Sequence, residues 1–251
     1  MSRLIIFGAT GSLGRHVLEQ ALTAGHQVTV LVRTPSKLPF EAAPLVSIHT
    51  GDLNALAPSD LAGLVGGHDA LINCAGHVTK GEGFVDLIDR VVTGVELLRP
   101  PRPVCWFLAG AALLDIDTSG RRGVELPKVK STYWPHRINF ERLGRSRFDW
   151  RILCPGPMVE QPALGLNRLR VSLDTLPVQM PAFTRALPGP LLVPLFASVV
   201  PQMIVPYADA AALMLANIEP GSEMTRRRVG LALPPGMRGR KSQWAPEPSH
   251  A

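Results

Sequence analysis

The chain has 251 residues, 46% of them hydrophobic, which is enough to bury a substantial core in one α/β domain. Of its 26 basic and 20 acidic residues, six basic and one acidic follow Thr225, so the body before that residue carries 20 basic and 19 acidic side chains. A nearly neutral body excludes a broad electropositive face, and we expect no nucleic-acid partner.

The first predicted element is a buried strand over Leu4–Phe7, where every residue is apolar. The strand starts almost at Met1, with no basic and then apolar leader in front of it. We therefore expect no secretory or transit signal and a cytoplasmic location.

The turn after this strand carries glycines at the spacing GxxGxxG, within the string LIIFGATGSLG. We expect Gly8 to adopt a positive φ, Gly11 to let the backbone approach a ligand, and Gly14 to let helix and strand pack closely. Because the N–H groups at a helix N-terminus are unpaired and lie at the positive end of the helix dipole, they hold a pyrophosphate without a cationic side chain. The predicted cofactor-binding residues of this loop are Gly8, Thr10, Gly11, Ser12, Leu13 and Gly14.

The context of the glycines favours a dinucleotide site over an ordinary strand-to-helix turn. A helical pattern begins at Ser12, and a second strand over Gln27–Arg33 follows at the distance that a βαβ unit requires. The string GATGSLGRHV resembles the atypical short-chain dehydrogenase/reductases, in particular their NAD(P)H-binding, NmrA-like branch of redox sensors and flavin or quinone reductases. The resemblance implies a Rossmann-type, doubly wound parallel sheet.

The end of the second strand bears on the choice of cofactor. An acidic residue there accepts the ribose 2′-hydroxyl of NAD, whereas a cation accommodates the 2′-phosphate of NADP. This chain has Arg33 at that position, followed by Thr34, Ser36 and Lys37. A guanidinium, two hydroxyls and an ammonium favour NADP, and the alternative is a surface arginine at a strand end.

A third strand over Val46–Thr50 runs into Gly51, Asp52 and Leu53. The family resemblance implies that Asp52 and Leu53 lie against the adenine ring, while the alternative for Asp52 is a turn or capping role. The helix that follows is predicted to begin with Ser59 as its N-cap.

The fourth strand lies within Asp69–Gly76 and ends in Asn-Cys-Ala-Gly, which resembles the family's NNAG-type strand end. Ligands of open parallel sheets bind outside the carboxyl ends of the strands. We therefore expect Cys74, Ala75 and Gly76 to lie beside the nicotinamide ribose.

The remaining pattern continues the strand and helix alternation of a doubly wound sheet. It comprises a helix over Phe84–Leu98 with Val85, Ile88, Val92 and Val95 on one face, and strands over Val104–Ala109, Asp149–Cys154 and Arg228–Leu233.

Cys74, Cys105 and Cys154 lie in separate strands without metal-ligand spacing, which predicts buried, reduced thiols and no metal. We predict one domain over 1–233 and a disordered basic tail over 234–251, with the cations after Thr225 solvated.

The sixth strand ends in Pro155 and Gly156, which resembles the family's DWTILRPG segment and implies a cofactor contact. From 157 to 204 the composition changes, and we expect this segment to form the side of the site that binds a small apolar substrate. Residues 186–206 are apolar enough to suggest a membrane span, but five prolines would interrupt a spanning helix. A pocket wall or lid is the favoured interpretation, and contact with a membrane surface is the alternative.

The residues Tyr133 and Arg137 match the family's catalytic tyrosine and the lysine four positions later, with arginine in place of lysine. Pro135 fits the first turn of a helix, so Ser131 or Thr132 is predicted to cap it. Arg137 would favour the phenolate by its charge but cannot shuttle a proton as lysine does.

The family's serine is missing, because Leu108–Ala111 stands where a VSS-type strand end is expected and the next hydroxyl is Thr118. His136, His77 and Thr79 are further candidates, although a lone histidine in a loop is more often structural. Arg137 and Glu141 also form an i,i+4 pair that any solvated helix carries. Two functions follow: an NADP-dependent oxidoreductase acting on a small carbonyl, quinone or flavin-like acceptor, or a non-catalytic NADPH-binding sensor or partner-binding protein.

Overall fold

The computed structural model describes residues 1–38 and 46–240, so the predicted tail lies outside the described residues from 241 onward. Its central sheet has eight strands in the order β3-β2-β1-β4-β5-β6-β10-β8. Seven are parallel, and β8 at one edge is antiparallel to β10. The predicted doubly wound sheet is therefore confirmed. The strands are β1 (Arg3–Phe7), β2 (Gln27–Val32), β3 (Val46–Thr50), β4 (Ala70–Asn73), β5 (Val104–Leu108), β6 (Trp150–Pro155), β8 (Arg170–Leu173) and β10 (Arg228–Ala232).

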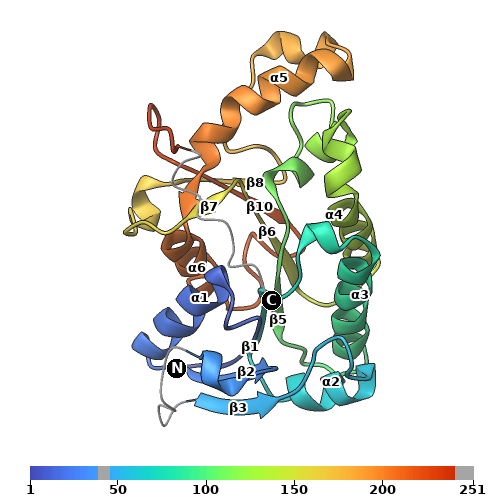
Figure 1. The fold of residues 1–251 in the computed structure, drawn as a ribbon, viewed down its shortest axis with the longest axis vertical. Helices are drawn as coiled ribbons and strands as arrows, with labels where there is room; N and C mark the ends of the chain where they lie inside the picture. The colour runs from blue at the N-terminus through green and yellow to red at the C-terminus, as the bar shows by residue number, and fades with distance from the viewer. Residues whose placement is uncertain (39–45, 241–251) are drawn as a thin grey trace.

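The helices form a layer on each face of the sheet, as Figure 1 shows. One layer holds α1 (Ser12–Thr23) and α6 (Tyr207–Leu215), and the other holds α2 (Pro58–Val65), α3 (Glu82–Glu96) and α4 (Val129–Gly144). Each layer buries its own apolar cluster because successive side chains of a strand point to opposite faces. In β5, Trp106 packs beneath α1 and α6, whereas its neighbour Phe107 packs with α3 and α4. Fully buried parallel strands explain the continuous apolar runs of the sequence.

The strand order reverses at β1, which pairs with β2 on one side and with β4 on the other. Such a reversal opens a crevice at the carboxyl ends of the two diverging strands, where open α/β sheets bind ligands. The glycine loop after β1 and the Asn-Cys-Ala-Gly segment after β4 both lie at this point. The fold thus brings together two segments that the sequence predicted to contact the cofactor.

Two predicted helix starts and one predicted helix face are wrong in detail. Helix α2 begins at Pro58, with Ala57 as N-cap and no capping side chain, so Ser59 does not cap it. Proline suits the first helical position because its fixed φ is already helical and its missing N–H would be unpaired there. In α3 the buried stripe includes Phe84, Leu87 and Val91, and Val85 lies at its margin.

Helix α4 begins two residues before the predicted cap, at Val129, with Lys128 as N-cap at φ 67°. The reason is tertiary, since the N–H of Lys130 donates to the carbonyl of the buried Leu126 and thereby anchors the first turn. Pro135 consequently lies inside the helix, where it removes one backbone hydrogen bond. Ser131, one of the two predicted caps, instead donates its hydroxyl to the carbonyl of Lys128.

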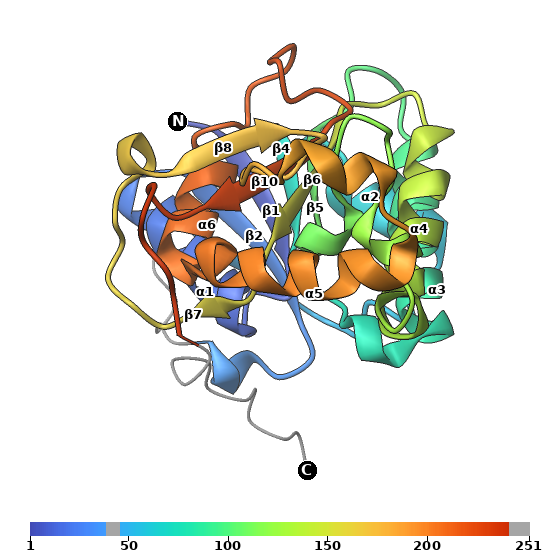
Figure 2. The ribbon, with the colours of Figure 1, turned by 90° about the horizontal axis from the view of Figure 1, so that it is seen from above.

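The segment over 157–204 contains elements that the sequence pattern did not predict. Besides β8, it holds α5 (Gly189–Val199) and the strand β7 (Met158–Val159), which pairs with β9 (Val205–Pro206). Seen from above, α5 extends from the side of α6 toward α4 (Figure 2). Its residues Leu192, Phe196 and Val199 join the core cluster of α3 and α4. No helix among the described residues is both long and apolar enough to cross a bilayer.

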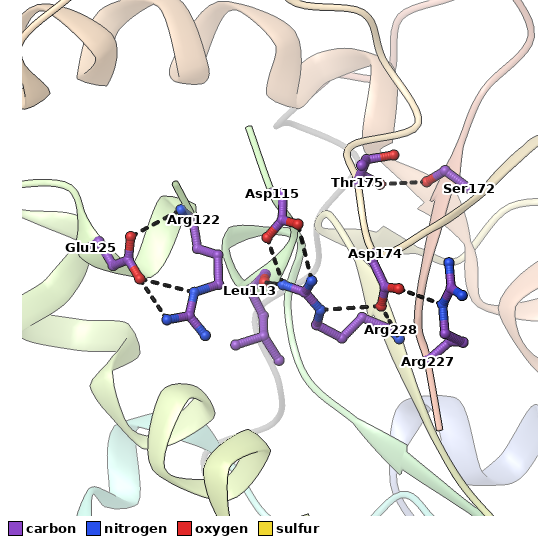
Figure 3. Close-up of polar contacts among 9 residues, drawn as sticks. All are labelled: Leu113, Asp115, Arg122, Glu125, Ser172, Asp174, Thr175, Arg227 and Arg228. Atoms are coloured by element: carbon purple, nitrogen blue, oxygen red, sulfur yellow. Dashed lines mark hydrogen bonds and ion pairs between the residues drawn. The ribbon is translucent and has the colours of Figure 1, made fainter. Parts of the chain in front are cut away.

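The cations after Thr225 do not all belong to a solvated tail, which corrects the sequence prediction. Arg228 is the first residue of β10 and is buried, with its guanidinium within 2.9 Å and 3.2 Å of the two Asp115 oxygens. It also donates to the carbonyl of Leu113 at 2.7 Å and pairs with Asp174 (Figure 3). Arg227 pairs with Asp174 from a more exposed position. These contacts join β10, β8 and the chain after β5 at the far edge of the sheet.

We expect Arg228→Ala to lower the free energy of unfolding by about 3 to 5 kcal/mol, because it removes the buried cation that pairs with Asp115 and Asp174 and leaves, among the described residues, only Arg227 beside Asp174. The adjacent Arg227→Ala is the matched control. Its side chain is 45% exposed, so its loss should cost less than about 1 kcal/mol. Urea unfolding of both variants measures the difference, and equal losses would contradict the structural role assigned to Arg228.

Candidate functional site

The three glycines of the loop after β1 each have a distinct steric role. Gly8 has φ 74°, as predicted, and a Cβ on it would lie 2.7 Å from the backbone nitrogen of Ala75. A Cβ on Gly14 would lie 2.0 Å from the carbonyl oxygen of Gly8, so α1 and β1 pack more closely than any side chain permits. Gly11 is extended rather than left-handed, at φ −80°, and it is exposed, although a Cβ on it would lie 3.3 Å from the carbonyl oxygen of Gly8.

The N-terminus of α1 fits the diphosphate of a dinucleotide. Gly11 is its N-cap, and no side chain accepts a hydrogen bond from the first turn. Thr10 and Gly11 are exposed and Ser12 is half-buried, whereas Leu13 and Gly14 are buried beneath them. The first-turn N–H groups therefore sit at the positive end of the helix dipole on an exposed rim, which is the donor arrangement that binds phosphate.

The segment after β4 forms the other wall of the crevice. The side chain of Asn73 accepts a hydrogen bond from the N–H of Ala75 at 3.2 Å and so shapes the turn. Gly76 has φ 102°, and a Cβ there would lie 2.4 Å from the ring of Phe84. Cys74 and Ala75 are half-buried, and burial raises the pKa of the Cys74 thiol to about 12, which keeps it protonated. Cys105 and Cys154 are buried free thiols, as predicted.

The end of β2 presents its polar groups to solvent. Arg33, Thr34, Ser36 and Lys37 are all exposed, on and around the short 3₁₀ turn Pro35–Lys37. Within residues 1–38 and 46–240, neither Arg33 nor Lys37 is paired with a carboxylate. Among the described residues, therefore, no carboxylate competes with an anion for these two cations.

The other predicted cofactor residues lie beside the crevice with roles in the fold as well. One oxygen of Asp52 accepts hydrogen bonds from the backbone and side chain of Asn54, which is the turn role considered above. Leu53 is buried in the core. Pro155 ends β6, and a Cβ on Gly156 would lie 2.5 Å from the carbonyl oxygen of Met203, so glycine lets the chain after α5 pass close to the end of β6.

On α4, the side chains of Tyr133 and Arg137 have different surroundings. Tyr133 is half-buried and stacks on the ring of His136 with centroids 5.9 Å apart. Arg137 forms a hydrogen-bonded ion pair with Glu141 at 2.6 Å, and both side chains are more than a third exposed. The guanidinium of Arg137 thus pairs with the solvated i,i+4 carboxylate rather than with the phenol.

His136 lies beside Gly110, in the segment after β5 where the family resemblance implies a serine that this chain lacks. Its Nε2 would lie 3.6 Å from a Cβ on Gly110, and its ring meets Phe84 edge to face. Burial and the nearby His77 lower the pKa of His136 to about 4, so the imidazole is neutral at pH 7. His77 and Thr79, the other polar candidates, hydrogen-bond to each other at 2.7 Å.

Sequence reasoning missed a group of side-chain contacts that connects α1 to the chain after β6. Glu160 binds Arg15 at 3.1 Å and His16 at 2.9 Å, and the ring of His16 stacks on Tyr207 of α6. Arg15 and His16 directly follow the glycine motif, which was the available signal. Their partner lies 144 residues or more away in the sequence and could not be identified from spacing.

Comparison with known proteins identifies the family of the chain and supports its fold. A sequence model of a family described as NAD(P)H-binding matches residues 8–186. Among solved structures, a protein of Bacteroides thetaiotaomicron provisionally named an epimerase is 18% identical, covers 93% of this chain and 97% of its own, and has a TM-score of 0.69. A Streptococcus pneumoniae protein provisionally named an NADH-flavin reductase is 20% identical, with 93% and 100% covered and a TM-score of 0.63.

A third similar structure is a wide-type short-chain dehydrogenase/reductase of Veillonella parvula in complex with NADP. It is 15% identical, covers 99% of both chains and has a TM-score of 0.64. At these identities the likeness concerns the fold. The family match covers the glycine loop, the segment after β4 and α4, whereas α5 and the chain after it lie beyond the match.

We expect Gly14→Ala to weaken dinucleotide binding and lower the free energy of unfolding by about 1 to 3 kcal/mol, because the new methyl group overlaps the carbonyl of Gly8 and pushes α1 from β1. Gly63→Ala is the control, since Gly63 lies in α2 with nothing within 4 Å of the new Cβ. That change should leave binding intact and stabilise the helix slightly. Calorimetric titration and thermal unfolding measure both effects, and unimpaired binding by a folded Gly14→Ala variant would remove the phosphate role from this loop.

Proposed function

The chain belongs to the NAD(P)H-binding family, and we propose that it is an NADP-dependent oxidoreductase that transfers a hydride to a small apolar carbonyl, quinone or flavin-like acceptor. Bound NADPH would supply the hydride, and the protein would bind, orient and desolvate the two reactants. In this proposal residues 1–233 act as one cofactor-binding domain, with 157–204 as its substrate side.

The observation that carries the proposal is the contact between the loops after β1 and β4 at the reversal of strand order. The backbone of Gly8 lies directly against Cys74 and Ala75, and the uncapped N-terminus of α1 opens beside them. A diphosphate on α1 would direct the nicotinamide half of the cofactor toward Ala75 and Gly76. Tyr133 of α4 stacks on His136, whose ring lies beside Gly110 after β5 and meets Phe84, the residue that packs against Gly76.

The exposed end of β2 supports NADP over NAD. A 2′-phosphate there would meet the guanidinium of Arg33 and the ammonium of Lys37, both unpaired within the described residues, together with the hydroxyls of Thr34 and Ser36. Charge-assisted hydrogen bonds to a phosphate are about twice as strong as neutral ones. Lys37 can also follow the phosphate, because its side chain is exposed and flexible.

The class of acceptor is proposed from the apolar residues around the end of β5. Ala111, Ala112 and Leu113 follow this strand, and Phe196 of α5 packs over them beside Gly123. Such apolar walls suit a flat, poorly hydrated acceptor. A quinone or flavin spreads the charge that a hydride brings, so it depends less on the missing serine than a ketone does.

The second candidate function is a non-catalytic NADPH-binding sensor or partner-binding protein. It is favoured by Ala109, Gly110 and Ala111, which offer no hydroxyl at the end of β5, and by the pairing of Arg137 with Glu141 instead of the phenol. Oxidation of NADPH with a panel of quinones, flavins and aldehydes separates the two functions. Tight NADPH binding without turnover of any acceptor would favour the sensor.

We expect Arg33→Asp to weaken NADPH binding by about tenfold to a hundredfold, because a charge-assisted hydrogen bond contributes about 1.5 to 3 kcal/mol. NADH binding should change little, since the new carboxylate can accept the ribose 2′-hydroxyl. Arg99→Asp, an exposed change of the same charge between α3 and β5, is the control. Dissociation constants for both cofactors are the measurement, and equal weakening of NADPH and NADH would show that Arg33 does not read the phosphate.

For Tyr133→Phe we expect a small change in turnover with a quinone or flavin and no change in NADPH affinity. With a carbonyl acceptor, loss of a proton donor would cost about 10² to 10⁴ in turnover, because a ketone becomes an alkoxide that needs a proton at once. Arg137→Ala should lower both rate and cofactor affinity if its guanidinium reaches the ribose. Steady-state kinetics on each acceptor class test this, and a several-hundredfold loss with a carbonyl would reverse our preference for a quinone-like acceptor.

A further inference from the structure

Helix α4 carries two buried polar side chains whose hydrogen-bonding atoms have no partner among the described residues. His136 and Asn139 lie one turn apart, and each is 7% exposed. The Nδ1 of His136 and both amide atoms of Asn139 are buried and unpaired. An unpaired buried polar atom costs about 1 to 3 kcal/mol, so three of them on one helix face indicate a polar ligand.

The two side chains face one cavity that has room for such a ligand. The volume that the centre of a water molecule can occupy in this cavity is about 10 Å³, which is close to what one water requires. The other lining side chains are apolar. The lining residues include Ile88 of α3, Phe107 of β5 and Ile152 of β6. Because a buried water makes two to four hydrogen bonds, the imidazole and the amide together supply the partners that it requires.

One end of this cavity leads toward the reaction crevice. The His136 Nε2 points at Gly110 after β5, and its ring lies against Tyr133. The contact with Phe84, which itself packs under Gly76, fixes the ring orientation. A neutral imidazole donates a proton from one nitrogen and accepts one at the other, so this ring can pass a proton without becoming charged in the interior.

The other end approaches solvent. Asn139 also lines a groove of about 150 Å³ between α3 and α4, whose walls carry charged side chains. Arg142 pairs there with Asp89 and Glu96, which keeps the groove polar. The side chain of Asn139 therefore lines both the small inner cavity and the groove between α3 and α4, and it lies between the two.

We propose that His136 and Asn139 hold a water molecule that delivers the reaction proton from the groove between α3 and α4 to the end of β5. The proposal rests on the reductase function above. The hydride adds to a quinone acceptor and gives the hydroquinone anion, and the Nε2 of His136 donates one proton to its oxygen to complete the hydroquinone. In the same step the Nδ1 of this ring takes a proton from the water, which regains one from the groove. After the hydroquinone leaves, Nε2 takes a proton from water in the crevice and Nδ1 returns its proton to the buried water, which restores the starting tautomer for the next turnover. His136 and Asn139 thereby take over the proton supply that the missing serine and lysine would otherwise provide.

The water site is tested first without turnover, by NMR on the protein with NADPH bound. We expect magnetisation transfer between a long-lived water and the side-chain amide of Asn139, and a hydrogen-bonded Nδ1 signal for His136. Both should disappear in Asn139→Leu, which keeps the volume of the side chain but removes its polar atoms. A dry cavity in the folded wild-type protein would overturn the proposal.

The relay is tested by solvent and cofactor isotope effects on quinone reduction. Loss of a general acid costs on the order of 10² or more in rate, so His136→Phe should lower turnover by at least about tenfold, with NADPH affinity unchanged. Phenylalanine keeps the ring contacts with Tyr133 and Phe84. Asn139→Leu should lower turnover less, but in both variants the solvent isotope effect should rise as proton delivery becomes rate-limiting, and added imidazole should partly rescue His136→Phe.

The matched control is His68→Phe, which removes a partly buried, hydrogen-bonded histidine before β4, at the amino end of the sheet. It should reduce stability without changing the isotope effects. If wild-type protein reduces quinones and His136→Phe keeps the rate and the isotope effects, the relay is wrong although the proposed function stands. If the water is bound but no acceptor is reduced, the proposed function fails and with it the relay, which leaves a structural water.

Discussion

The backbone contact of Gly14 with Gly8 is the constraint on which the cofactor half of the protein depends. No Cβ fits between them, so α1 starts immediately above the end of β1 and its N-terminus opens into the crevice. Gly8 in turn lies against the backbone after β4, which sets the width of the crevice at the reversal of strand order. One set of close backbone approaches thereby positions the donors for a diphosphate and the chain that would lie beside the nicotinamide ribose.

The segment over 157–204 is held to the sheet by different forces. Polar interactions tie it to the sheet, with Arg228 bridging the chain after β5 to β8 (Figure 3) and Glu160 connecting the chain after β6 to α1. Asp209, fully buried at the start of α6, accepts hydrogen bonds from the N–H groups of Leu164 and Gly165. These ion pairs and hydrogen bonds join residues that are far apart in the chain. They hold the segment over 157–204 in place, although its sequence lacks a regular hydrophobic periodicity.

The two faces of helix α4 have different surroundings. Its outer face carries the solvated pair of Arg137 with Glu141, and its inner face carries Tyr133, His136 and Asn139 at intervals of three residues. That inner spacing brings a phenol, an imidazole and an amide into one line beside β5. His136 of this line lies beside Gly110, in the segment where the chain lacks the hydroxyl that the family resemblance implied.

The sequence by itself determined the seven parallel strands of the sheet and the glycine loop. These follow from local rules, because continuous apolar runs form buried parallel strands and the spacing of Gly8, Gly11 and Gly14 admits a close strand-to-helix turn. The exposed cations after β2 were likewise readable, since a strand end needs no distant partner to define it.

Only the tertiary structure decided where α4 begins, which arginines are buried, and which polar atoms lack partners. Lys128 adopts its left-handed conformation because Leu126 is anchored in the core, and Arg228 leaves the basic C-terminal region for the sheet because Asp115 and Asp174 meet it there. His136 and Asn139 become unpaired only through the packing of α3, β5 and β6 around them. The partners of Arg228 and the residues that enclose His136 and Asn139 lie far away in the sequence, and no periodicity or spacing encodes such contacts.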